Sequence, residues 1–173
     1  MKVYDGSRTD QSKDVEPDRI KVGIAEYEVT ADGAHLTTSG LGSCIGVALI
    51  DPVADVAGLV HVMLPNAEEM EDGNAAKFAD TGTELLVEEM EQEGAERNSI
   101  EAKIAGGSDM LDFSESGSSI GVRNAEQVQA TLAEYDIPIL GEDVGGDHGR
   151  SLRLEASNGD LVVKSANETD KVL

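Results

Sequence analysis

Two short apolar runs near the middle of the chain constrain its fold more than any other feature. Cys44–Ile50 ends at Asp51-Pro52, and Val56–Leu64 ends at Pro65. Both runs are short and largely apolar, contain β-branched residues and are bounded by turn residues, which is typical of strands buried on both faces. About four residues separate them, a usual length for a hairpin loop. We therefore expect a buried β-hairpin at the centre of the fold.

The rest of the chain mixes strand and helix patterns. Helices are expected from Asn74 to about Glu93 and from Asn124 to about Tyr135, with Asn124 and Gln127 resembling a capping box. Further strands are expected within residues 19–29, 34–38, 99–105, 137–142, 151–156 and 161–165. Hairpins combined with two helices, without a regular strand–helix–strand repeat, predict the α+β class.

A length of 173 residues favours a single domain. Residues 1–18 lack apolar periodicity, so we expect a disordered acidic arm there, followed by one domain over 19–166 and a polar tail over 167–173. No apolar run reaches the roughly 18 residues of a membrane span, and no signal peptide is recognised, so a cytoplasmic protein is expected. The one cysteine excludes an intramolecular disulfide framework and a thiolate-rich zinc site.

The net charge of −22 comes from 35 acidic residues against 13 Lys and Arg, and the acids are spread along the whole chain. Such a surface repels phosphate backbones and anionic lipids, so neither nucleic-acid binding nor membrane insertion is expected. Dispersed acidity is typical of a halophile, whose salty cytosol screens the self-repulsion. The alternative is an ordinary acidic protein that binds a basic partner.

The candidate reactive group is Cys44, which follows a Gly/Ser-rich loop and begins the first apolar run. His61 lies in the second run. A thiol beside an imidazole is the minimum for thiol nucleophilic catalysis, and an imidazolium would lower the pKa of the thiol. Backbone N–H groups of Gly42 and Ser43, and that of Cys44 itself, are candidates for holding an oxyanion. The non-catalytic alternatives are that Cys44 is an inert buried thiol and that His61 is a structural core histidine.

The hairpin register decides whether the thiol and the imidazole meet. If Asp51 pairs with Val56, His61 is the diagonal neighbour of Cys44 on one face. A turn shifted by one residue on each strand, with Ile50 opposite Asp55, would place the two directly opposite each other. An even register would put them on opposite faces.

Other features around this hairpin leave further possibilities open. Gly46 and Ala48 make the cysteine face of the first run small, which would leave room for another group to approach. His35 and His148 are competing histidines. The acidic residues near His148 make a weak metal site conceivable, but their spacing matches no metal-binding motif.

The chain resembles the CheD family of chemoreceptor glutamine deamidases, in order from about residue 20 to 165. The matching segments are Thr38–Cys44, Asp51-Pro52, His61–Pro65, Ala79–Thr81, Ala102–Gly107, Ile120–Asn124 and Gly145-Gly146. The resemblance implies layered β-sheets flanked by helices, like those of deamidating toxins, and hydrolysis of receptor Gln side chains to Glu with release of ammonia.

By position, the resemblance makes Cys44 the nucleophile, His61 the general base and acid, and Thr38 the residue that orients the histidine. It implies no metal and no organic cofactor. Expected partners are methyl-accepting chemotaxis receptors and a CheC-type phosphatase of phosphorylated CheY, and a monomer is expected. Two alternatives stay open: an adaptor that mainly binds CheC-type proteins, and a non-catalytic domain with a structural cysteine.

Overall fold

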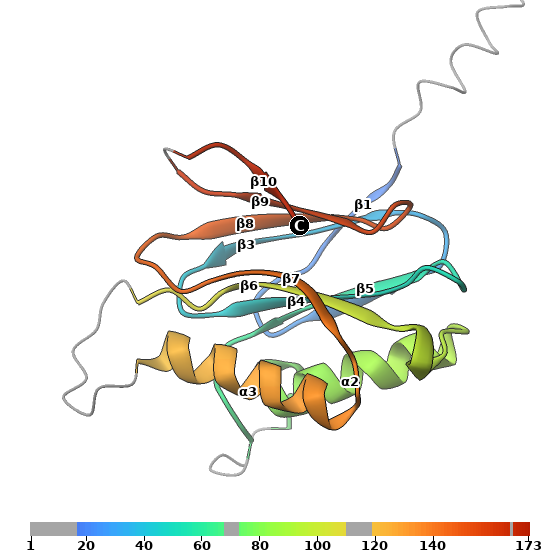
Figure 1. Ribbon diagram of the computed structural model, residues 1–173, viewed down its shortest axis with the longest axis horizontal. Coiled ribbons are helices and arrows are strands. Elements are labelled where there is room, and N and C mark those ends of the chain that lie inside the picture. The colour runs from blue at the N-terminus through green and yellow to red at the C-terminus, as the bar shows by residue number, and fades with distance from the viewer. Residues whose placement is uncertain (1–16, 68–72, 110–118, 167) are drawn as a thin grey trace, which may run out of the picture.

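A computed structural model describes residues 17–67, 73–109, 119–166 and 168–173. These described residues form three layers, with two β-sheets stacked on each other and two helices against one of them (Figure 1). We call the sheet between the other two layers the central sheet and the remaining sheet the outer sheet. The α+β class and the layered sheets expected from the sequence are confirmed.

The central sheet has the strand order β2-β5-β4-β6-β7, and only β6 and β7 pair in parallel. Its strands are β2 (Tyr27–Thr30), β4 (Ile45–Asp51), β5 (Val56–Val62), β6 (Glu101–Gly106) and β7 (Ile139–Val144). The outer sheet has the order β1-β3-β8-β9-β10. Its strands are β1 (Arg19–Lys21), β3 (His35–Leu41), β8 (Arg150–Glu155), β9 (Asp160–Lys164) and β10 (Lys171–Val172).

The expected hairpin, β4–β5, forms the middle of the central sheet, and every residue of both strands is buried. Ile45, Val47 and Leu49 pack against the helices, whereas Ala48 and Ile50 belong to the core shared with the outer sheet. Asp51 pairs with Val56, and its carboxylate accepts the turn N–H groups of residues 53 and 54. The buried hairpin therefore separates two apolar cores, one on each face.

The small face of β4 is not an open approach to the thiol. A Cβ atom added to Gly46 would lie 2.4 Å from Cδ1 of Leu152 in the outer sheet. Small residues on this face allow the two sheets to pack closely, so the expectation of free space there is wrong.

The two helices pack side by side on the other face of the central sheet (Figure 1). They are α2 (Ala79–Gln92), preceded by the 3₁₀ turn η1 (Ala75–Lys77), and α3 (Ile120–Glu134); a second 3₁₀ turn, η2 (Arg97–Ser99), leads into β6. Asn74 caps η1 through its side chain, so α2 begins later than expected. Ser119 caps α3 by accepting the N–H of Val122.

The interpretation of Asn124 as the head of a capping box is wrong, because this residue lies inside α3 and is fully buried. At the end of the chain, Lys171–Val172 pairs with β9, so the segment expected to be a polar tail extends the outer sheet. The expected N-terminal arm lies outside the described residues, except for Pro17 and Asp18.

Candidate active site

The register of the hairpin brings Cys44 and His61 to one face. His61 lies opposite Gly46, so it is the diagonal neighbour of Cys44, as expected for pairing of Asp51 with Val56. This face is directed toward the outer sheet, and Cys44 packs against the core between the sheets while keeping partial exposure. The imidazole is thus enclosed and the thiol lies at the edge of the enclosed region.

A third side chain reaches His61 from the outer sheet. Thr38 of β3 is buried, and its Oγ1 lies 2.7 Å from Nδ1 of His61 and 2.7 Å from the carbonyl oxygen of Val22. A hydroxyl has one proton to donate, and the carbonyl can only accept it. Thr38 therefore accepts a hydrogen bond from the Nδ1–H of His61. This arrangement leaves Nε2 unprotonated, with its lone pair available as a base.

The backbone around His61 is also fixed. Its N–H donates to the carbonyl of Glu26, and its carbonyl accepts the N–H of Ala25. Nε2 is buried and makes no hydrogen bond to the described residues, and the Cys44 thiol likewise donates to none of them. The resting site thus holds an oriented imidazole whose second nitrogen is unused.

Burial is the main cause of the pKa shifts of Cys44 and His61. It raises the pKa of the Cys44 thiol above 9.0 and lowers the pKa of His61 to about 4. The expectation that an imidazolium lowers the pKa of the thiol is therefore wrong for the resting state. Around neutral pH the site holds a neutral thiol and a neutral imidazole, which suits a histidine that accepts the thiol proton during attack.

This protonation state makes a prediction for alkylation of Cys44 by iodoacetamide. Since the thiolate is the reactive species, alkylation at about pH 6 should be slower than that of a free thiol. The rate should rise with pH through and above the ordinary thiol pKa of 9.0. Mass spectrometry of the Cys44 peptide gives the rate. A fast plateau at mildly acidic pH would instead indicate a preformed thiolate–imidazolium pair.

In the loop before Cys44, carbonyl groups are hydrogen-bonded, whereas two N–H groups have no partner among the described residues. The carbonyl of Gly42 accepts hydrogen bonds from both the backbone N–H and the hydroxyl O–H of Ser108, and the carbonyl of Cys44 accepts the N–H of Gly107. The N–H of Gly42 donates to the carbonyl of Gly40. By contrast, the N–H groups of Ser43 and Cys44 donate to none of the described residues.

Asn124 connects the segment that carries Cys44 with the segment that carries His61. Its Nδ2 donates to the carbonyl of Ser43, directly before the cysteine, and to that of Met63, two residues after His61, each at 2.9 Å. This role of Asn124 was not predicted from the sequence. A signal was available, because a polar residue stands beside Ala125 and four before Val128, both of which face the core.

The remaining candidate histidines do not join this arrangement. His35 lies on the far face of β3, since the alternate residues Leu36 and Thr38 point into the core. Nδ1 of His148 lies 3.9 Å from a carboxylate oxygen of Asp147 and 4.0 Å from one of Glu168. Among the described residues, no group of three His, Cys, Asp or Glu side chains is arranged to hold a metal ion.

The chain is similar in sequence to a known protein family and to named proteins. A family model described as CheD chemotactic sensory transduction matches residues 63–165. A protein of Haloarcula marismortui named "Probable chemoreceptor glutamine deamidase CheD" is 63% identical over 99% of both chains. The chain belongs to the CheD family. Within the part of this CheD-family chain that the structure describes, no helix is long and apolar enough to cross a membrane.

Two further relatives have comparable coverage. A protein of Natronomonas pharaonis with the same name is 43% identical, over 90% of this chain and 93% of its own. The "Chemoreceptor glutamine deamidase CheD" of Halalkalibacterium halodurans is 41% identical, over 89% of this chain and 98% of its own. The Haloarcula relative supports the halophilic interpretation of the acidic composition.

Proposed function

We propose that this chain is a protein-glutamine deamidase, which hydrolyses selected Gln side chains of methyl-accepting chemoreceptors to Glu and releases ammonia. The observation that carries the proposal is the Thr38–His61 hydrogen bond, which leaves Nε2 as a base on the face shared with Cys44. Membership of a family whose relatives are named chemoreceptor glutamine deamidases supplies the substrate class.

The first half of the reaction forms a thioester. Nε2 of His61 accepts the Cys44 proton as the sulfur attacks Cδ of the glutamine. The oxyanion that develops faces the N–H groups of Ser43 and Cys44, which have no other partner among the described residues. The imidazolium then gives its proton to the departing nitrogen, and ammonia leaves. Because an amide nitrogen is a poor leaving group, this proton donation is essential.

The second half returns the enzyme to its resting state. Neutral His61 accepts a proton from water, whose oxygen attacks the thioester carbon. The carbon–sulfur bond breaks, Cys44 recovers its proton from the imidazolium, and the glutamate side chain leaves. One water is consumed and one ammonia released per glutamine. The residues of the chain supply every proton transfer in this scheme, so it requires no cofactor.

Thr38 is assigned the role of orienting His61 and fixing its tautomer. We predict that Thr38→Val, which keeps the shape but removes the hydrogen-bond acceptor, lowers kcat roughly 10- to 100-fold. Thr38→Ser should retain most of the activity, because it keeps the hydroxyl. Steady-state kinetics of both variants provide the test. Equal losses in the two variants would mean that Thr38 acts through packing and not through its hydroxyl.

Asn124 is assigned a positioning role, since its amide holds the segments that carry the nucleophile and the base. In Asn124→Leu two partly buried carbonyls lose their donor, so unfolding free energy should fall by about 1–3 kcal/mol. We expect kcat to fall more than KM rises. Gln127→Leu, one turn along on the same helix, is the matched control. A loss of stability with unchanged kcat would make Asn124 purely structural.

The proposed substrate is tested with peptides from receptor signalling domains, incubated with the full-length chain in high salt. Mass spectrometry should show conversion of specific Gln residues to Glu, with a matching yield of ammonia. Absence of conversion by folded protein would favour the adaptor alternative. A CheC-type phosphatase partner, a monomeric state and a cytoplasmic location belong to the same proposal, on the strength of the family.

A further inference from the structure

Among the described residues, no helix covers the face of the outer sheet that points away from the central sheet, because α2 and α3 lie on the opposite side of the molecule (Figure 1). The side chains of this open face follow from strand alternation. Ile20, Leu36, Leu152 and Val163 pack into the core between the sheets. Their neighbours along each strand therefore point to the open face.

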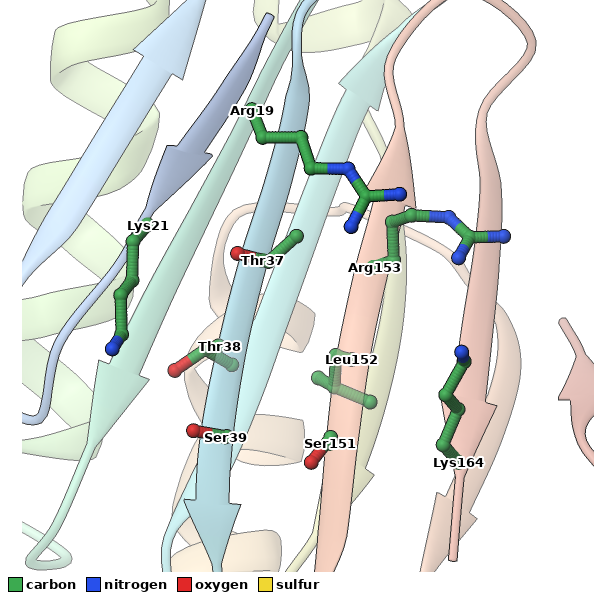
Figure 2. A pocket seen from close by; sticks show the side chains of 9 residues that line it. All are labelled: Arg19, Lys21, Thr37, Thr38, Ser39, Ser151, Leu152, Arg153 and Lys164. Carbon is green, nitrogen blue, oxygen red and sulfur yellow. The ribbon is translucent and has the colours of Figure 1, made fainter.

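Those neighbours bring cations together. Arg19, Lys21, Arg153 and Lys164, four of the 13 Lys and Arg of the chain, line one concavity of about 190 Å³ on the open face (Figure 2). They come from three different strands. Lys21 pairs in register with Thr37, and Thr37 with Arg153, so these three side chains stand in one row across the sheet.

Hydroxyl groups add hydrogen-bond donors to the same concavity. Thr37, Ser39 and Ser151 line it between the cations (Figure 2). Ammonium and guanidinium groups combined with hydroxyls are the donor set that binds carboxylate and phosphate oxygens. The concavity is therefore chemically suited to an anion.

The charge on this face is opposite to that of the molecule. Its strands present two carboxylates, Glu155 and Asp160, which face each other in register at one end. Glu155 pairs with Arg153 at 2.8 Å. Arg19, Lys21 and Lys164 are exposed and make no ion pair with the described residues. In a chain of net charge −22, three exposed cations without an ion-pair partner among the described residues favour binding of an anionic ligand.

We propose that this open face binds a carboxylate-rich segment of an acidic protein partner. Adjacent strands lie about 4.8 Å apart, so the cations from β1 to β9 span roughly 14 Å, more than one small anion covers. At molar salt the Debye length is only about 3 Å, so recognition requires direct ion pairs of the kind that this row of cations offers.

The proposed binding site adjoins the candidate active site but does not use its thiol. Thr38 lines the concavity from within β3 and also contacts His61 on the inner face. An acidic segment bound on the open face would therefore be separated from His61 by the thickness of strand β3. The proposal is independent of the deamidase function, because binding can be measured with Cys44→Ser protein.

The test is a titration of the full-length Cys44→Ser protein, which cannot convert Gln to Glu, followed by the amide signals of its ¹⁵N NMR spectrum. The probes are a short Glu-rich peptide, the same peptide with Gln in place of Glu, and inorganic phosphate. We expect the Glu peptide to shift the signals of Thr37, Ser39 and Ser151, and the Gln peptide to leave them unchanged. Lys21→Glu and Lys164→Glu should each weaken binding about tenfold. Arg123→Glu, the same charge change at an exposed position of α3, is the matched control and should change affinity less than about twofold.

Three results would overturn the proposal. The first is equal binding of the Glu and Gln peptides. The second is binding of phosphate as tight as that of the Glu peptide, which would indicate a small-anion site without a protein partner. The third is an equal loss of affinity in Arg123→Glu and Lys21→Glu, which would mean general attraction and not a site.

Discussion

Replacing Cys44 with Ser should lower the rate of glutamine deamidation by at least about 10⁴-fold, because the nucleophile of the proposed mechanism is lost. A serine hydroxyl has a far higher pKa than a thiol, and the neutral His61 cannot activate it to the same extent. The substitution removes no hydrogen bond, since the thiol makes none with the described residues. Unfolding free energy should therefore change little. The measurement is conversion of receptor peptides by both proteins at equal concentration.

This variant also separates the two functions that the family suggests. Binding of receptor peptides or of a CheC-type partner should survive in Cys44→Ser, because the surface of the protein is nearly unchanged. Deamidation at an unchanged rate would remove Cys44 from the mechanism. Loss of both binding and deamidation in a folded variant would mean that the cysteine supports the surface and not the chemistry.

The second large effect is expected at Gly106, at the end of β6. Its φ is +119°, and a Cβ atom there would lie 2.2 Å from the carbonyl oxygen of Cys44. The glycine carbonyl accepts from Arg150, which also pairs with Asp143, so this backbone cannot shift easily. We predict that Gly106→Ala costs about 3 kcal/mol or more of unfolding free energy. Any folded fraction should have lost activity, because Cys44 is displaced.

The control for this prediction is Gly33→Ala. Gly33 also has a positive φ, of +81°, but a Cβ atom there would meet nothing within 4 Å. Gly33→Ala would introduce the backbone strain of a positive φ without a steric collision. The expected loss of unfolding free energy is therefore about 1 kcal/mol. Chemical denaturation in high salt compares the two variants. Equal costs would mean that the collision with the Cys44 carbonyl is relieved by movement of the loop.

The hairpin could be predicted from the sequence because its signals are local: two apolar runs flank a turn at Asp51-Pro52. Its register was left open by the sequence, and the observed pairing of Asp51 with Val56 is what places His61 on the cysteine face. The protonation state could not be predicted in this way. It depends on burial by the outer sheet, and so on contacts between segments that are distant along the chain.

Thr38 and Asn124 show the limit of local signals. Thr38 belongs to a different sheet from His61, so only the family resemblance pointed to it. Asn124 fits a helix cap by type and spacing, but Ser119 occupies that role one turn earlier. The amide of Asn124 instead serves two carbonyls that are 81 and 61 residues away in the chain. The only trace that either residue leaves in the sequence is the position of Asn124, beside Ala125 and four residues before Val128, both of which face the core.

Partitioning with hydroxylamine shows whether deamidation passes through an acyl group on Cys44. A thioester should be intercepted by hydroxylamine as well as by water, so receptor peptides should yield glutamyl hydroxamate in proportion to its concentration. Mass spectrometry distinguishes this product from Glu, and Cys44→Ser should form neither. Production of Glu alone at every hydroxylamine concentration, or hydroxamate formed equally by Cys44→Ser, would contradict the account.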